Sequence, residues 1–153
     1  SVKVTDWRRN NITWQKTNPP PNLACRCFTH STETILWARK NEKKSRHFFN
    51  YQEMKEMNGG KQMKDVWTGS LTKPSEKTEG KHPTQKPEYL LERIVLASTE
   101  EGQIILDPFC GSGTTGVEAV RFGRKFIGID VSEEYMEISK KRLEKVLESE
   151  KEY

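Results

Sequence analysis

The chain has 153 residues, of which 33% are hydrophobic and 31% are charged, and its formal net charge is +4. No apolar run approaches the roughly 18 residues of a membrane span, and no segment resembles a signal peptide, so we expect a cytoplasmic protein. The charge is divided unevenly: residues 1–86 carry 17 Lys or Arg against 8 Asp or Glu, a net +9, whereas residues 87–153 carry 9 against 14, a net −5. The basic part is expected to face a polyanion.

The first half of the chain predicts little regular structure apart from one strand. Residues 34–38 (TILWA) form a short apolar run of β-forming residues, which predicts a buried strand. Three consecutive prolines, residues 19–21, follow Asn18 in TWQKTNPPPN. They predict a stiff loop with no strand leading into it. Residues 58–82 are rich in Gly, Lys, Ser and Thr and predict a long loop, in which Trp67 is expected to pack in the core.

The second half predicts alternating helices and strands. A helix is expected to begin at Pro87, because proline is favourable at a first helical position and an apolar stripe follows. Residues 103–107 predict a strand, 114–122 a helix and 125–130 a second strand. Ser132 is expected to cap a last helix that ends near residue 148. This order indicates a βαβ unit with a parallel sheet and therefore an α/β fold.

A glycine-rich segment connects the first of these strands to its helix. Residues 107–116 (DPFCGSGTTG) contain the spacing G-x-G-x-x-G, and Asp130 follows Gly111 by 19 residues, where an acid meets ribose hydroxyls. The pattern predicts a nucleoside site. A nicotinamide dinucleotide fits less well, because the carboxylate of Asp107 would repel a pyrophosphate and attract a cationic cofactor such as S-adenosylmethionine (SAM). The alternative is a turn whose glycines serve chain geometry alone.

Two segments resemble DNA amino-methyltransferases, which methylate adenine N6 or cytosine N4. DPFCGSGTTG with FIGID resembles motif I and its acidic partner, and GKHPTQKPEYLLERIV, residues 80–95, resembles the segment before motif I in the beta group of that family. The resemblance implies a Rossmann-like SAM-dependent methyltransferase fold with a parallel-type sheet. Residues 1–153 would form a single methyltransferase domain that contains only part of this fold. Residues 81–153 would then bind the cofactor, through Asp107, Pro108, Phe109, Gly111, Gly113, Thr114 and Asp130 on one side and His82, Pro83, Thr84, Gln85 and Lys86 on the other.

The resemblance also implies a reaction, the transfer of a methyl group from SAM to the exocyclic amine of a flipped base. Adenine N6 is favoured over cytosine N4, in a restriction-modification context. The family's chemistry requires Asp, Asn or Ser, then Pro-Pro, then an aromatic residue, and Pro21 stands where the aromatic residue is required. We assign no catalytic residue, expect the motif to precede residue 1, and expect the chain to be inactive alone. The alternatives are one subunit of a split enzyme and a non-catalytic DNA-binding or cofactor-binding module.

The resemblance places target recognition in residues 39–80, where cations are frequent. We expect contacts with the phosphates of double-stranded DNA from Arg39, Lys40, Lys43, Lys44, Arg46, Lys61 and Lys64. Other expected partners are an N-terminal half or subunit that carries the catalytic motif, and a second copy of the chain. The three cysteines do not have the spacing of a zinc or thioredoxin motif, so we expect reduced thiols and no metal.

Overall fold

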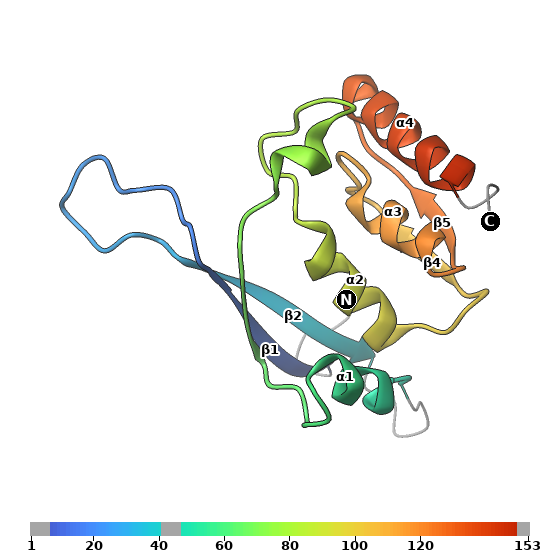
Figure 1. Ribbon diagram of the computed structural model, residues 1–153, viewed down its shortest axis with the longest axis horizontal. Helices are drawn as coiled ribbons and strands as arrows, with labels where there is room; N and C mark the ends of the chain where they lie inside the picture. Colours follow the sequence, from blue (N-terminus) through green and yellow to red (C-terminus); the bar gives the residue numbers. More distant parts are fainter. Residues whose placement is uncertain (1–6, 41–46, 150–153) are drawn as a thin grey trace.

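The computed structural model describes residues 7–40 and 47–149, which form an α/β fold with two sheets (Figure 1). No helix in these ranges is long and apolar enough to cross a membrane. The elements in chain order are β1 (Trp7–Lys16), β2 (Thr32–Lys40), α1 (Tyr51–Met57), β3 (Val66–Gly69), the 3-10 helix η2 (Pro74–Lys77), α2 (Glu88–Ser98), β4 (Ile104–Asp107), α3 (Thr114–Arg121), β5 (Lys125–Gly128) and α4 (Glu133–Ser149).

The larger sheet has the strand order β2-β1-β3. β1 pairs antiparallel with β2 and parallel with β3, and Trp14 lies opposite Trp67 in the parallel pair. Ile12 and Trp14 are buried and pack with Trp67 and with Leu90 of α2, since alternate side chains of a strand point to the same face. The Trp14 indole donates a hydrogen bond to the Tyr89 hydroxyl at 2.7 Å. The sheet and α2 therefore share one closed aromatic core.

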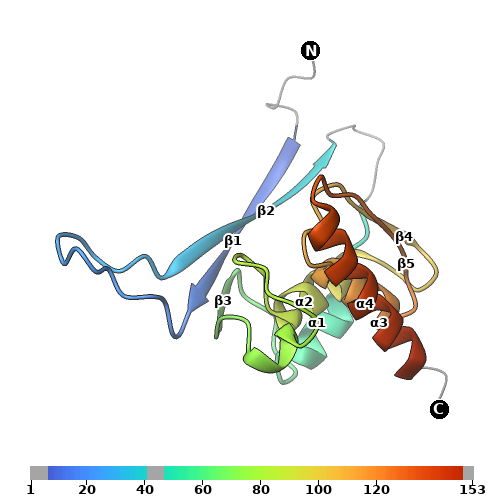
Figure 2. The ribbon, with the colours of Figure 1, turned by 90° about the horizontal axis from the view of Figure 1, so that it is seen from above.

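The connection between β1 and β2, residues 17–31, projects away from the body of the molecule (Figures 1 and 2). Its base is held by Asn18, whose side-chain oxygen accepts a hydrogen bond from the Leu71 backbone N–H at 2.8 Å. Farther along, Leu23 and Phe28 are fully exposed. The segment around Asn18 is a loop, as predicted.

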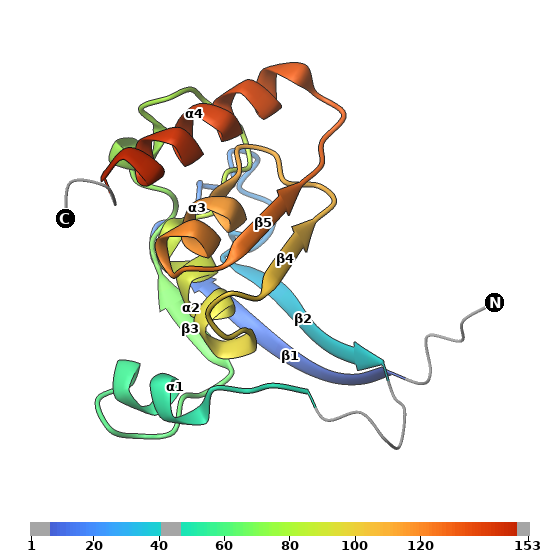
Figure 3. The ribbon, with the colours of Figure 1, turned by 90° about the vertical axis from the view of Figure 1, so that its right-hand side faces the viewer.

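The smaller sheet consists of β4 and β5, which are parallel and joined through α3. α3 covers one face of this sheet, and α4 packs against α3 (Figure 3). The approach is close at Gly116, where a Cβ atom would lie 2.4 Å from the Phe126 ring. Large apolar side chains of both strands remain exposed, including Leu106 at 59% and Ile127 at 51%. The βαβ unit predicted from the sequence is therefore present, with one helix-covered face.

Most predicted elements of the second half are confirmed within one or two residues, and so is the strand at 34–38. Two predictions were wrong: β1 leads directly to the proline-rich loop, and the expected long loop at 58–82 contains β3 and η2. β1 carries few apolar residues because only its inward side chains, Ile12 and Trp14, reach the core. Its stability comes from pairing with two strands that are distant in sequence, a signal that local composition lacks. Trp67 is buried in the core, as expected.

Candidate functional site

The glycine segment forms the turn between β4 and α3. Gly111 and Gly113 have φ angles of 52° and 75°, in the left-handed region that favours glycine, and Gly113 is the N-cap residue of α3. A Cβ atom on Gly113 would lie 2.1 Å from the Ser139 hydroxyl oxygen, and one on Gly111 would lie 3.0 Å from Nε2 of His82. Both glycines are therefore required for conformation and for close packing of the backbone against its neighbours.

Two carboxylates hold this turn in place. Asp107, at the end of β4, accepts hydrogen bonds from the Phe109 backbone N–H at 3.1 Å and the Thr115 hydroxyl at 2.7 Å. Asp130, after β5, accepts one from the Ser132 N–H at 3.0 Å and one from the Gly111 N–H at 2.8 Å. These backbone donors lower the pKa of Asp130 below its usual range. Each carboxylate oxygen keeps a free lone pair for a ligand.

The segment before α2 forms a second wall opposite the turn. The His82 ring stacks on Tyr135 of α4 with centroids 4.1 Å apart. Gln85 is buried and its amide nitrogen donates to the Glu76 carbonyl at 2.7 Å, but its Oε1 atom has no hydrogen-bond partner. Lys86 pairs with Glu33 of β2 at 2.5 Å, which connects this wall to the larger sheet. A buried acceptor without a partner costs free energy.

Nine of the twelve residues predicted to bind the cofactor line one cavity of about 290 Å³. This volume is close to the lower end of small-molecule sites, about 300–1,000 Å³. The turn side contributes Asp107, Phe109, Gly111, Thr114 and Asp130, and the opposite wall contributes His82, Thr84, Gln85 and Lys86. The other three, Pro83, Pro108 and Gly113, lie in the same segments without lining the cavity.

Five lining residues were not predicted: Leu91, Cys110, Ser112, Thr115 and Tyr135. Three of them lie within the glycine segment, so its length alone could have indicated them. Burial, followed by the nearby carboxylates of Asp107 and Asp130, raises the pKa of the Cys110 thiol, which therefore stays neutral. Leu91 and Tyr135 reach the cavity from helices, and no local motif marks them. Within the described ranges, no group of three His, Cys, Asp or Glu is placed to hold a metal ion.

Arg142 of α4 connects the turn to the second wall, and sequence reasoning missed it. Its side chain is 6% exposed, and its guanidinium donates to the Ser112 carbonyl at 2.8 Å and the Thr114 hydroxyl at 3.0 Å. The same guanidinium pairs with Glu88, the first residue of α2, at 3.0 Å. One buried cation therefore fixes the start of α3 relative to the start of α2.

Lys61 and Lys64, two of the residues predicted to contact DNA, do not line this cavity. Lys43, Lys44 and Arg46 are outside the described residues. Arg39 and Lys40 are the last two residues of β2, six and seven residues after Glu33. Lys61 and Lys64 are exposed in the connection between α1 and β3.

Comparison with known proteins agrees with this geometry. The chain matches the DNA methylase family (N6_N4_Mtase) over residues 2–141. It is 78% identical over 136 residues to the type II methyltransferase M2.LlaDCHI of Lactococcus lactis subsp. cremoris. The matched segment is 89% of this chain and 51% of the relative. It is 77% identical over 135 residues to the type II methyltransferase M2.DpnII of Streptococcus pneumoniae. The matched segment is 88% of this chain and 50% of the relative. The chain thus spans about half the length of these curated relatives.

A solved structure shows the same arrangement. The crystal structure of an M1.HpyAVI–SAM complex matches with a TM-score of 0.72 and 36% identity, covering 90% of this chain and 63% of that one. The fold is thus the Rossmann-like fold of SAM-dependent DNA methyltransferases, of which this chain contains a part. With the family match over most of its length, the chain belongs to the N6/N4 DNA methylase family.

Proposed function

We propose that this chain binds SAM and is the cofactor-binding portion of a DNA amino-methyltransferase of a restriction-modification system. The observation that carries the proposal is the cavity between the glycine turn and the second wall, where nine motif residues that are distant in sequence converge. The match to type II methyltransferases supports it. The basic first part of the chain supports DNA as the substrate.

The donors and acceptors around the cavity suit SAM. Asp130 is ionised and retains acceptor capacity for ribose hydroxyls. Asp107 supplies negative charge for a cofactor that carries a sulfonium and an amino group. The left-handed turn at Gly111 lets a ligand approach the backbone without meeting a Cβ atom.

Bound SAM would supply an activated methyl group, and the residues of this chain would hold and orient it. The proposed acceptor is the exocyclic amine of a flipped base, with adenine N6 favoured over cytosine N4 on overall resemblance. Mass spectrometry of nucleosides from methylated DNA distinguishes the two products. No residue of this chain is assigned to the base, because the sequence contains no Pro-Pro-aromatic motif.

A second polypeptide segment is part of the proposal. The open face of the β4–β5 sheet exposes Ile104, Leu106, Ile127 and Ile129, and Phe109 next to the cavity is 87% exposed. Contiguous exposed apolar surface is typical of an interface. We propose that the catalytic half, as the preceding part of the same polypeptide or as a separate subunit, covers this face. We therefore expect methyl transfer when this chain is mixed with the catalytic half, and no transfer by this chain alone.

Calorimetric titration with SAM tests the cofactor assignment. Gly113→Ala is expected to weaken SAM binding at least tenfold, because its Cβ atom would meet α4 at Ser139. Gly59→Ala is the matched control, since Gly59 has a similar φ of 65° but nothing within 4 Å of its Cβ position. A wild-type chain that binds no SAM, or a Gly113→Ala variant that binds as well as wild type, contradicts the proposal.

Mixing the chain with the upstream half of a relative tests the second part. Methyl transfer to DNA that requires both pieces supports a divided or fragmented enzyme. SAM binding without transfer under any combination favours the non-catalytic module instead. Self-association of the chain, seen in sedimentation, would assign the open face to a second copy.

A further inference from the structure

A second cavity, remote from the glycine turn, gathers positive charge. Its volume is about 460 Å³, and it lies between the connection that follows α1, the edge strand β3 and the middle of α2. Its charged lining residues are Lys61, Lys64 and Arg93, and the amides of Asn58 and Gln62 also face it. No carboxylate is among its lining residues. Three cations that line one cavity without a lining carboxylate form a site for an anion.

Arg93 is the half-buried member of this group. Its guanidinium lies over the Trp67 ring, 4.9 Å from the centroid, and its buried Nε atom has no hydrogen-bond partner. Burial lowers the pKa of Arg93. Among the described residues no carboxylate forms an ion pair with it. The Glu92 carboxylate attracts Arg93 electrostatically without forming an ion pair with it. A partly desolvated cation that lacks an ion-pair partner is costly, and a bound anion would offset that cost.

The backbone that carries the two lysines is held in place. The Asn58 side-chain amide donates to the carbonyls of Lys61 at 3.1 Å and Gln62 at 3.0 Å. The Trp67 indole N–H donates to the Lys64 carbonyl at 2.9 Å. Because these bonds fix the connection, the lysines start from defined positions, and less entropy is lost when an anion binds.

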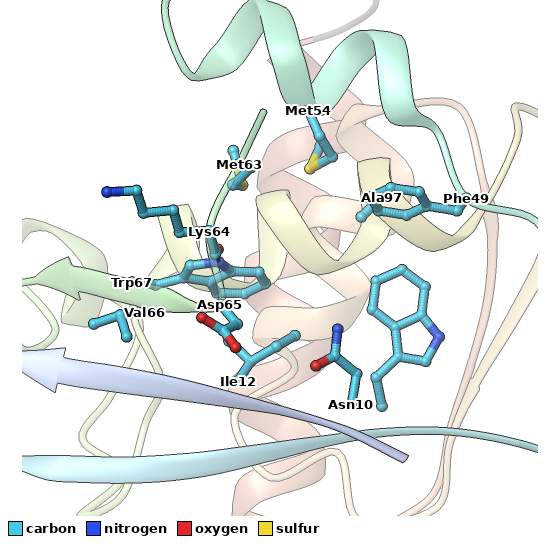
Figure 4. A pocket seen from close by; sticks show the side chains of 11 residues that line it. Asn10, Ile12, Phe49, Met54, Met63, Lys64, Asp65, Val66, Trp67 and Ala97 are labelled. Carbon is cyan, nitrogen blue, oxygen red and sulfur yellow. Dashed lines mark hydrogen bonds between the residues drawn. The ribbon is translucent and has the colours of Figure 1, made fainter. Parts of the chain in front are cut away.

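A neighbouring cavity of about 370 Å³ shares Lys64 and Trp67 with this one, and its lining also includes Asp65, Met54 and Ala97 (Figure 4). Figure 4 shows Lys64 extending away from Met54 and Ala97, so its ammonium group avoids the apolar side. Lys61 and Arg93 line only the larger cavity, so two of the three cations belong to it alone. An aromatic ring beneath a guanidinium also keeps that group flat and oriented.

We propose that Arg93, Lys61 and Lys64 bind a backbone phosphate of the DNA, an inference that rests on DNA being the substrate under the proposed function. Arg93 lies five residues after Glu88 on α2, about 8 Å along the helix axis. One rigid helix thus connects the wall of the SAM cavity to the phosphate site. Contacts of this kind fix the position of a duplex on the protein and carry no sequence information.

The salt dependence of DNA binding tests the site. Anisotropy of a labelled duplex is measured against NaCl concentration for wild type, Arg93→Gln, Arg93→Lys and the control Lys140→Gln, which removes an exposed cation of α4. Arg93→Gln is expected to make the slope of log K against log salt shallower by about 0.9, the loss of one phosphate contact. Arg93→Lys is expected to keep the slope, and Lys140→Gln to bind as wild type does.

The outcomes separate this inference from the proposed function. A wild-type slope in Arg93→Gln overturns the phosphate site, while DNA binding itself still supports the proposed function. A wild-type chain that binds SAM but no DNA contradicts the site and the proposed substrate together. If Arg93→Gln does not fold, the double variant Lys61→Gln/Lys64→Gln gives the same reading, with a slope shallower by about 0.9, since all three cations serve one phosphate. Inorganic phosphate that competes only at millimolar concentration indicates a strand phosphate and not a free anion as the ligand.

Discussion

The two sheets differ in how completely they are buried. In the β2-β1-β3 sheet, Trp14 is 1% exposed and Trp67 is 5% exposed, and both pack under α2, although Leu36 and Val66 of the same sheet are more than half exposed. In the β4-β5 sheet, α3 covers one face, while the opposite face leaves Leu106 and Ile127 more than half exposed. The difference teaches that stability and function are concentrated in different places. The first sheet contains the closed core, and the second presents the cavity at the carboxyl ends of its strands.

This placement follows the general rule for parallel α/β sheets, in which ligands bind beyond the carboxyl ends of the strands. Asp107 and Asp130 both occupy such ends. An incomplete sheet can still form this site because the turn is held by its own hydrogen bonds and by α4. The contrast between a closed core and an open site can be tested by truncating matched residues in each sheet.

The largest effect is expected from Trp14→Ala. It removes the most buried aromatic side chain of the core and the hydrogen bond to Tyr89. Truncating a buried Trp costs about 3–5 kcal/mol of unfolding free energy, which urea denaturation measures. Trp14→Phe keeps most of the volume and should cost less. A loss below about 1 kcal/mol for Trp14→Ala would show that this sheet is not the stability centre.

Arg142→Met is expected to destabilise the chain by about 1–3 kcal/mol, because it removes buried hydrogen bonds and leaves Glu88 with Arg121 as its remaining ion-pair partner. It also releases Ser112 and Thr114 of the turn, so SAM binding should weaken beyond what the lower stability explains. The check is SAM affinity measured far below the melting temperature. Arg142→Lys should recover part of that affinity. Unchanged affinity in Arg142→Met would mean that the turn holds its shape without α4.

Sequence and structure agree best where the information is local. The glycine turn, its flanking elements and most cavity residues follow from motifs a few residues long, so they could be predicted. β1 and β3 could not, since their stability depends on pairing across 50 or more residues, as at Trp14 and Trp67. Arg142 was missed for the same reason: its partners lie about 30 and 54 residues away along the chain. A buried arginine in a helix of charged residues gives no local signal.

Glu118 lies at the junction of the two regions, between α3 and α2, and predicts a pH effect. It is fully buried, and burial, with Glu88 and Glu92 nearby, raises its pKa to about 7, although Arg121 opposes this. Between its unfolded pKa near 4.5 and about 7, only the folded state binds this proton, so stability falls as pH rises through that window. Each pKa unit corresponds to about 1.4 kcal/mol, so the loss from pH 5 to pH 8 is on the order of 3 kcal/mol.

The variant Glu118→Gln isolates that contribution from every other titrating group. We expect it to match wild type at pH 5 and to exceed the wild-type free energy of unfolding at pH 8, as measured by urea denaturation at both values. If the free energy of unfolding changed with pH in the same way in both proteins, Glu118 would not be the source of the pH effect.

The smallest effect is expected from Ile127→Ser on the open face of β5. Ile127 is 51% exposed, so its loss should change the unfolding free energy of this chain by less than about 0.5 kcal/mol. SAM affinity should also stay unchanged, since Ile127 does not line the cavity. If the catalytic half covers this face, the same substitution should weaken complementation of methyl transfer at least severalfold, because a hydroxyl would be buried in an apolar interface. A large loss of stability in the isolated chain would instead place Ile127 in a closed core and remove the contrast between the two sheets.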